Sequence, residues 1–341
     1  MEHRSLGRAG LKVSALSLGC MTFGESQTWM KGVTSPDDEA HRVLDAALDR
    51  GVTLLDTADV YSDGRSEELL GEWLGWKRDH VLVATKCRFP MGPGVAHAAG
   101  PNDQGLSRHH VIRSCEASLR RLKTTWIDLY HVHMQDGATP VEETLRALDD
   151  LVSSGKVRYV ACSNYTGYRL VESLWAADRR DTVRYESVQL QWSLVDRGCE
   201  RDVVPACRAF GLGVLVWGAL ARGFLSGKYR RGAEPPKGSR FESWRDTLKH
   251  YDRDENWRAL DAVERIARAR GTSASAVAHA WLLGKREVSS LIIGARDVKQ
   301  LEDNLSCLEL ELTPDEMSEL DKVSAPDWGY PQSFIAMREA W

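Results

Sequence analysis

The chain has 341 residues, of which 43% are hydrophobic and 28% are charged, and its formal net charge is −4. This length and composition fit either one large α/β barrel or two ordinary globular domains. The negative charge argues against a nucleic-acid or anionic-membrane surface, because such partners attract positively charged proteins. We therefore expect small molecules as partners, with no nucleic acid and no membrane.

The N-terminal stretch is charged and broken by glycine, and the longest apolar runs are far shorter than a membrane span. These features predict a cytoplasmic protein. The seven cysteines are odd in number and widely spread, without the spacing typical of zinc sites or disulfide frameworks. We expect buried, reduced thiols and no metal.

Short apolar runs alternate with longer segments of helical periodicity, which is typical of repeated βα units. A β-hairpin is expected first, over residues 4–13. The predicted strands then cover 15–19, 53–56, 81–85, 129–133, 159–162, 188–191, 214–217 and 291–293. The predicted helices cover 37–50, 66–74, 108–122, 141–153, 168–177, 203–210 and 274–283. Eight strands alternating with helices favour a (β/α)8 TIM barrel, and a single domain over residues 1–341 is the simplest account.

Three segments interrupt the regular spacing: 88–106, 219–256 and the aromatic tail 326–341. In a barrel the first two extend from the C-terminal ends of strands, where such enzymes place their active sites. We interpret them as substrate or cofactor loops, with surface insertions as the alternative, which has more weight for the tail. The apolar residues expected to contact substrate are Trp29, Phe89, Met91, Trp328 and Phe334.

Polar side chains stand where three of the predicted strands end. Asp56 lies in LLDTADVY, Lys86 in LVATKC and His133 in DLYHVH. Tyr61 lies in the loop that follows Asp56. A charge at a poorly solvated barrel mouth is unfavourable unless an opposite charge compensates it, and Asp56 and Lys86 can compensate each other. Each residue alone has a structural explanation, as a helix cap, a snorkelling lysine, a packed ring or a core histidine, but their joint placement favours a catalytic group.

This predicted group suits carbonyl reduction. The unperturbed pKa of a tyrosine is about 10, and a neighbouring ammonium lowers that pKa towards the working pH. We expect Lys86 to have this effect on Tyr61, while Asp56 keeps Lys86 charged and oriented. His133 is expected to hydrogen-bond the substrate oxygen, where negative charge develops.

The sequence contains neither GxGxxG at a strand-to-helix turn nor GxxxxGK[ST], so it offers no Rossmann fingerprint and no P-loop. The segments GALARGFLSGKYRRG and GARDVKQLEDN follow the last two predicted strands, where barrels frequently bind phosphate. Lys228, Arg240 and Arg296 are therefore candidate phosphate ligands. Taken alone, they would be better explained as ordinary solvated basic residues.

Over essentially its whole length the chain resembles the aldo-keto reductase family, as an NADPH-dependent, bacterial-type member. The matching stretches are LGRAGLKVSALSLGCMTFG, DTADVYSDGRSEELLG, ATK, DLYHVH, SNY, QLQWSLVDR, GALARGFLSGKY and IIGARDVKQLEDNL. By the family's DLYxxH pattern the catalytic histidine is His133, whereas His131 occupies a variable position. The resemblance implies that Asp56, Tyr61, Lys86 and His133 are catalytic.

The resemblance also implies a cofactor site, to which Asp56 belongs besides its catalytic role. Ser163, Asn164 and Gln189 are implied to hold the nicotinamide carboxamide, with Trp217 stacked on the ring. The residues implied at the pyrophosphate and ribose are Gly218, Leu220, Gly223, Lys228 and Arg240. Those implied at the adenosine end are Gly294, Arg296, Gln300, Asp303 and Asn304. Met21 and Thr22 are implied contacts of the cofactor ribose.

Arg296 beside the adenine ribose favours NADPH over NADH, because a guanidinium binds a 2′-phosphate in a fork geometry. Two residues depart from the family pattern. Cys162 stands where a glycine commonly precedes the Ser-Asn pair, and Trp192 replaces a common tyrosine. Cys162 either narrows the nicotinamide pocket, exposes a thiol, or is a small buried side chain in a strand.

The sequence thus predicts a reductase that transfers hydride from NADPH to an aldehyde or ketone, such as a ring ketone of a sugar, secondary metabolite or xenobiotic. The reaction would be reversible, and the protein a monomer or small homo-oligomer. One alternative is an NADPH-sensing or channel-associated subunit with slow turnover. Another is a metal-assisted hydrolase using Asp56 and His133, although the charge of Lys86 would compete with a metal.

Overall fold

A closed barrel of eight parallel strands forms the centre of the molecule, in the computed structural model that describes residues 1–26, 31–91 and 100–337. The strands run in the order β10-β3-β4-β5-β6-β7-β8-β9 around the barrel. Their bounds are β3 Leu16–Gly19, β4 Leu54–Asp56, β5 Leu82–Cys87, β6 Ile127–Val132, β7 Val157–Ser163, β8 Ser187–Gln191, β9 Gly213–Trp217 and β10 Val288–Gly294. The prediction of a (β/α)8 TIM barrel is confirmed.

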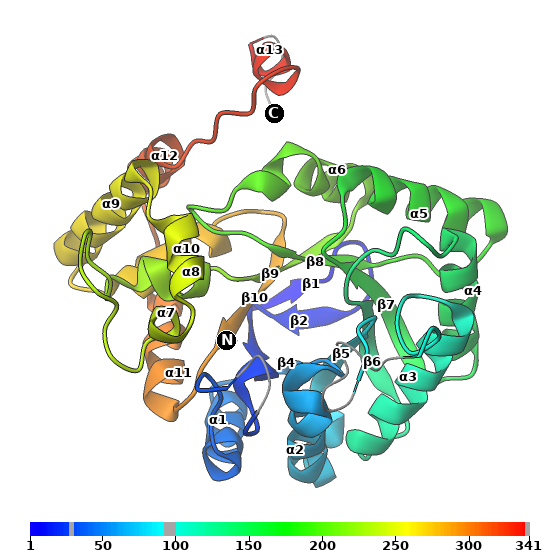
Figure 1. Ribbon diagram of the computed structural model, residues 1–341. Helices are drawn as coiled ribbons and strands as arrows, with labels where there is room; N and C mark the ends of the chain where they lie inside the picture. The colour runs from blue at the N-terminus through cyan, green and yellow to red at the C-terminus, as the bar shows by residue number, and fades with distance from the viewer. Residues whose placement is uncertain (27–30, 92–99, 338–341) are drawn as a thin grey trace.

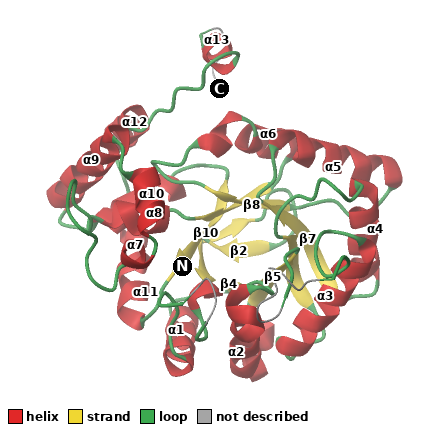
Figure 2. Cartoon of the chain, in the orientation of Figure 1, coloured by secondary structure: helices red, strands yellow, loops and turns green. Residues whose placement is uncertain are grey.

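Helices surround the strands on the outside of the barrel (Figure 2). Those that the periodicity predicted are α1 Asp37–Asp49, α2 Arg65–Leu74, α3 Arg108–Arg121, α4 Val141–Ser153, α5 Gly167–Arg180, α6 Val203–Phe210 and α10 Ala274–Leu283. In α4, the buried residues Val141, Leu145 and Leu148 recur at helical spacing and face the strands. Ser107 caps α3 by accepting a hydrogen bond from the backbone N–H of His110.

The segment 219–256, expected to be irregular, contains two short helices, α7 Arg240–Ser243 and α8 Arg245–Tyr251. The helix α9 Asp254–Arg270 follows and packs against α10 and against α12 Pro314–Val323. The helix α11 Val298–Leu305 begins just after β10. These helices lie together on one side of the barrel, between α6 and α1 (Figure 1).

The predicted N-terminal hairpin is present as antiparallel strands β1 His3–Ser5 and β2 Lys12–Ser14. It closes the amino-terminal end of the barrel, because Leu6 and Val13 pack there against Leu54 and Leu215. Its turn lies so close to the start of β9 that a Cβ on Gly7 would come within 2.4 Å of the backbone nitrogen of Gly213. Access to the barrel interior is therefore from the carboxyl ends of the strands.

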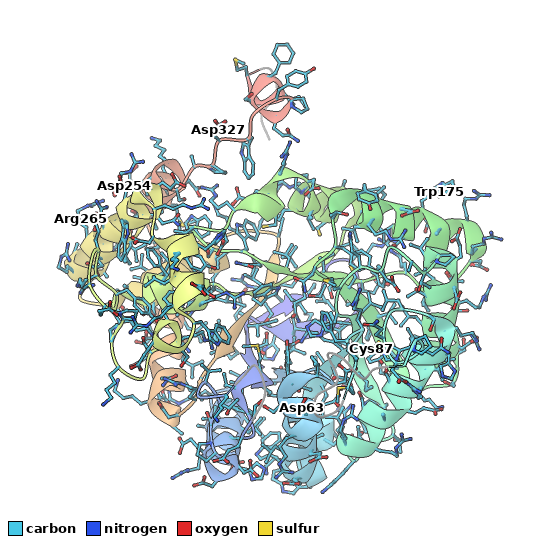
Figure 3. The ribbon with its side chains drawn as sticks, in the orientation of Figure 1. Asp63, Cys87, Trp175, Asp254, Arg265 and Asp327 are labelled. Atoms are coloured by element: carbon cyan, nitrogen blue, oxygen red, sulfur yellow. The ribbon has the colours of Figure 1, made fainter. Side chains whose placement is uncertain are left out.

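The aromatic tail does not reach that open end, so its interpretation as a substrate loop was wrong for Trp328 and Phe334. The chain passes Asp327 beyond α12 and ends in α13 Gln332–Ala336, away from the barrel (Figure 3). Trp328 lies in a surface groove with Val204 of α6 and with Glu287, which precedes β10. Phe334 is 55% exposed. Of the other candidates, Trp29 lies outside the described residues.

All seven cysteines are free thiols, and only Cys199 is partly exposed. Within the described ranges, no helix is both long and apolar enough to cross a membrane.

Candidate active site

Asp56 and Lys86 form an ion pair at the open end of the barrel. Asp56 is the last residue of β4, and Lys86 lies near the end of the neighbouring strand β5. Lys86 is 0% exposed. Its Nζ donates to Asp56 Oδ1 at 2.6 Å, to the carbonyl oxygen of Thr57 at 2.8 Å, and to the Tyr61 hydroxyl at 3.4 Å. The ammonium thus has three acceptors, two of which are predicted catalytic side chains.

Tyr61 is held by a loop that is tied to β5 and to the segment that follows β3. The backbone N–H of Asp59 donates to the carbonyl oxygen of Lys86, and the Ser62 hydroxyl donates to that of Gly24. Ser62 adopts a left-handed φ of 47° inside the short 3₁₀ helix Tyr61–Gly64. The Tyr61 ring meets the ring of His133 edge-on, with 5.7 Å between centroids. The loop therefore brings the phenol to the same point as Lys86 and His133.

Two opposing effects act on the Tyr61 phenol. Burial raises its pKa, while the charge of Lys86 lowers it, and the pKa stands above its ordinary value. The expectation that Lys86 brings this pKa down towards neutrality is corrected here, because burial outweighs the ammonium. Burial also lowers the pKa of Lys86, but Asp56 and Tyr61 outweigh burial and the pKa is raised. At neutral pH the site therefore holds a protonated phenol beside a charged ammonium.

His133 directly follows β6, and its backbone N–H donates to the carbonyl oxygen of Cys87 at 2.9 Å. Burial lowers the pKa of His133 well below its ordinary value, and the charge of Lys86 lowers it further. The imidazole is therefore neutral at physiological pH. Its Nδ1 is buried and has no hydrogen-bond partner among the described residues. A neutral imidazole suits hydrogen bonding to a carbonyl oxygen.

The residues implied at the nicotinamide surround this group. Ser163 ends β7, and Asn164 follows with a left-handed φ of 53°. The Asn164 amide donates to the carbonyl oxygen of His133 at 2.9 Å and to the Ser163 hydroxyl at 3.0 Å. Gln189 donates across the mouth to Asp56 Oδ2 at 2.7 Å. Trp217 ends β9 and is partly exposed.

The basic candidates gather near the ends of β9 and β10. Burial lowers the pKa of Lys228, and the charges of Arg296 and Arg240 lower it further. Burial also lowers the pKa of Arg240, to which Arg222 and Arg296 add. In the part of the chain that the structure describes, no carboxylate is among the groups that shift either pKa. Arg240 and Arg296 are partly buried and Lys228 is exposed. Neighbouring cations that repel one another without a counter-charge fit the phosphates of a dinucleotide.

Glycine backbone lies beside these cations. Gly218 and Gly223 have φ values of 75° and 98°, and Leu220 precedes the 3₁₀ helix Ala221–Ser226. A Cβ on Gly223 would come within 3.2 Å of Lys228 Nζ. A φ of 98° is one that residues with a side chain rarely adopt, so the backbone favours glycine at position 223.

The adenosine candidates and the ribose candidates lie next to each other at the junction of β10 and β3. Asn304 donates to the carbonyl oxygen of Gly294 at 3.0 Å, and Gln300 accepts from the backbone N–H of Arg296 at 3.2 Å. The Thr22 hydroxyl donates to the carbonyl oxygen of Ala295 at 3.5 Å. Met21 precedes Thr22 in the same 3₁₀ turn.

Asp303 is the candidate with the least local support, because it forms an exposed ion pair with Lys299 of its own helix.

Sequence reasoning missed a set of buried supports behind Tyr61. Glu67 of α2 is fully buried and accepts from the Thr85 hydroxyl at 2.5 Å and from Arg121 at 2.7 Å. Asp59 is buried beside this pair, and burial together with Glu67 raises its pKa well above the ordinary value. The stretch SEELLG contained the signal, since Glu67 lies on the apolar face of α2.

Within the described ranges, no three metal-ligating side chains gather as a metal site would require. The geometry of Asp56 and His133 thus does not support the metal-assisted hydrolase.

Comparison with known proteins identifies the family. Residues 15–325 match the sequence model of the aldo/keto reductase family. The chain belongs to this family. It is 36% identical to an uncharacterized oxidoreductase of Bacillus subtilis, over 95% of the chain and 96% of the relative. It is 34% identical to a probable voltage-gated potassium channel subunit beta of Arabidopsis thaliana, over 98% of the chain and 100% of the relative.

A third relative, the norsolorinic acid reductase of Aspergillus flavus, is 33% identical over 98% of the chain and 84% of its own length. Family membership and these oxidoreductase relatives support an oxidoreductase that acts on carbonyl compounds. The relatives come from plants, fungi and bacteria, so the resemblance is not restricted to bacterial members.

Proposed function

We propose that this aldo/keto reductase uses NADPH to reduce an aldehyde or ketone to an alcohol, and oxidises the alcohol in the reverse direction. The observation that carries the proposal is the contact of Lys86 Nζ with both Asp56 and the Tyr61 hydroxyl in a buried site. NADPH, when bound, supplies the hydride. The chain's own residues must then bind the carbonyl oxygen and provide a proton.

Tyr61 is the proton donor, because its raised pKa keeps the phenol protonated at neutral pH. Lys86 stabilises the phenolate that remains after proton transfer, and Asp56 holds the ammonium in place. His133 is neutral and donates a hydrogen bond to the carbonyl oxygen, which orients the substrate.

Lys228, Arg240 and Arg296 support NADPH as the cofactor. Their positive charges lie together in a partly buried place where an anion would relieve their repulsion. A dinucleotide with a 2′-phosphate brings two more negative charges than NADH, and guanidinium groups bind phosphate in a fork geometry. Ser163, Asn164 and Trp217 would hold the nicotinamide, and Gln300 and Asn304 the adenosine end.

An NADPH-binding subunit without significant turnover is the second candidate, since plant relatives of similar length are described as channel subunits. The complete group Asp56, Tyr61, Lys86 and His133 favours the reductase. We propose a cytoplasmic protein of one domain that acts as a monomer or small homo-oligomer on a small carbonyl compound.

The test follows NADPH absorbance in the presence of a neutral aromatic aldehyde, together with tryptophan fluorescence on addition of NADPH. We expect steady consumption of NADPH, and quenching that Trp217→Phe abolishes. Trp76→Phe, at a tryptophan that is 76% exposed on the outer surface, is the matched control and should leave the quenching intact. Quenching without turnover would favour the binding subunit, and the absence of both would refute the proposal.

A further inference from the structure

Arg88 follows β5 directly, next to Cys87, which Figure 3 labels in the barrel wall. Its Nε is buried and has no hydrogen-bond partner among the described residues. In the same part of the chain, no carboxylate lies within ion-pair distance of its guanidinium. Buried guanidinium nitrogens are normally paired, so this one is available to a ligand.

Strand register places Arg88 on the same side of the barrel as the catalytic candidates. Lys86 is paired with His131 and Cys87 with Val132 between β5 and β6. The next pair in this register is Arg88 and His133, and the hydrogen bond from His133 N–H to the Cys87 carbonyl continues the ladder. Arg88 thus follows the strand in the row of His133, and its charge is among those that lower the pKa of His133.

Phe89 links Arg88 to His133. The Arg88 guanidinium carbon lies 5.3 Å from the centre of the Phe89 ring, and that ring meets the His133 ring edge-on at 5.0 Å. A cation held over an aromatic face loses less freedom when it binds a ligand. The three side chains therefore form one wall beside the position of the substrate oxygen.

The titratable groups around Arg88 include one acid, Asp136, which forms no ion pair with it. Burial lowers the pKa of His110 to about 4, so this residue of α3 is neutral at physiological pH. Asp136, in the loop after β6, already accepts hydrogen bonds from the backbone of Leu106 and Ala138 and from the Thr139 hydroxyl. The charge of Arg88 helps to lower the pKa of Asp136, but the hydrogen bonds of Asp136 are made to its own loop and to Leu106, which leaves the Arg88 Nε without a partner among the described residues.

We propose that Arg88 is a specificity-determining residue that binds a carboxylate on the substrate, so that the preferred substrates are aldehydes or ketones carrying a carboxylate. This inference rests on the proposed function and names its substrate class. The carbonyl oxygen is fixed by Tyr61 and His133, and the Phe89 ring contacts both His133 and the Arg88 guanidinium. A substrate that carries its carboxylate across a benzene ring from the aldehyde would place that ring beside Phe89.

The experiment compares 4-carboxybenzaldehyde with its methyl ester, which has nearly the same shape and no charge. We expect the wild-type protein to have the higher kcat/KM for the acid. Arg88→Gln should lower kcat/KM for the acid by about tenfold to a hundredfold, mainly through KM, because a charged hydrogen-bonded pair is lost. The kcat/KM for the ester should change by no more than about twofold, because the ester has no charge to pair with Arg88. Arg88→Lys should recover part of the loss, since it keeps the charge but not the fork.

Arg113→Gln is the matched control, because it also removes one guanidinium. In the wild type, however, Arg113 already forms an exposed ion pair with Asp103. It should leave the preference for the acid unchanged. Equal losses for acid and ester in Arg88→Gln, or a wild type without preference for the acid, would overturn the inference while the ester still demonstrates the reductase. A wild type that reduces neither compound would refute the proposed function itself.

Discussion

Two groups of charges lie at the open end of this barrel, one buried and one partly exposed, and they are built in opposite ways. At the ends of β4 and β5, Lys86 is matched by Asp56 at 2.6 Å and by further acceptors. At the ends of β9 and β10, Lys228 and Arg240 are surrounded by other cations, with no carboxylate among the described groups that shift their pKa values. The cation at the ends of β4 and β5 has its counter-charge within the protein, whereas the cations at the ends of β9 and β10 have none among these groups.

The difference shows what each site does in the absence of a ligand. Matched charges hold a fixed geometry, so the proton donor is in position before substrate arrives. Unmatched cations destabilise the free protein and gain on binding an anion, so they contribute affinity for the cofactor. Substitutions should therefore act on chemistry in the first site and on cofactor affinity in the second.

The largest expected effect comes from Tyr61→Phe. Because the phenyl ring cannot supply a proton, we expect kcat for aldehyde reduction to fall by about 10²- to 10⁴-fold. NADPH affinity, measured by fluorescence titration, should stay within about twofold of wild type. Tyr330→Phe, on an 82% exposed tyrosine of the tail, is the control. Unchanged turnover in Tyr61→Phe would remove Tyr61 from its role.

The two sites should respond oppositely in the stability of the free protein. Asp56→Asn leaves the Lys86 ammonium buried without a carboxylate, so the free energy of unfolding should fall by about 3–5 kcal/mol. Arg240→Met removes a cation whose charged neighbours are Arg222 and Arg296, so the same quantity should rise by roughly 1 kcal/mol. Denaturant unfolding without cofactor measures both. A loss of stability in both variants would contradict the comparison.

A smaller and more selective effect is expected from Arg296→Gln. Loss of a charged contact to the 2′-phosphate should weaken NADPH by about tenfold to a hundredfold. NADH lacks that phosphate and should lose no more than about threefold. Isothermal titration with both nucleotides gives the ratio of their dissociation constants. Arg286→Gln is the control, because Arg286 precedes the amino end of β10, where it pairs with Glu287. Equal losses for both nucleotides would place Arg296 away from the 2′-phosphate.

The smallest expected effect is the response of reduction to pH. The proton donor must be protonated, and burial raises the pKa of Tyr61 above its ordinary value. The kcat/KM for reduction should therefore be nearly constant through neutral pH and decrease only in the alkaline range above about 10, as pH passes the raised pKa. A profile measured from pH 6 to pH 10 that falls near neutrality would show a donor with a lowered pKa.

The barrel could be predicted from the sequence because its strands are short apolar runs bounded by glycine and charged residues. The same periodicity located α4 and α6 at their observed bounds. It failed for α9, whose apolar residues Trp257, Leu260, Val263 and Ile266 recur every three positions among many charges. It also failed for the tail, since nothing in a run of aromatic residues tells which end of a barrel they approach.

The candidate site was predicted as far as strand ends allow. Asp56, Lys86 and His133 could be brought together because parallel strands end at the same face of a barrel. The direction in which the Tyr61 pKa is shifted could not be predicted, because it depends on how deeply the phenol is buried. The position of Arg88 beside His133 depends on the register between β5 and β6, which apolar patterns do not determine.

The hairpin β1–β2 covers the amino-terminal end of the barrel, where Leu6 and Val13 pack against Leu54 and Leu215. Cofactor and carbonyl compound must therefore both approach from the carboxyl ends of the strands, and the one that binds deeper is covered by the other. Under the proposed function, the nucleotide must enter before the carbonyl compound, and the alcohol must depart before the spent nucleotide can be exchanged. The hairpin at the amino-terminal end of the barrel thus constrains the order in which ligands bind and leave at the other end.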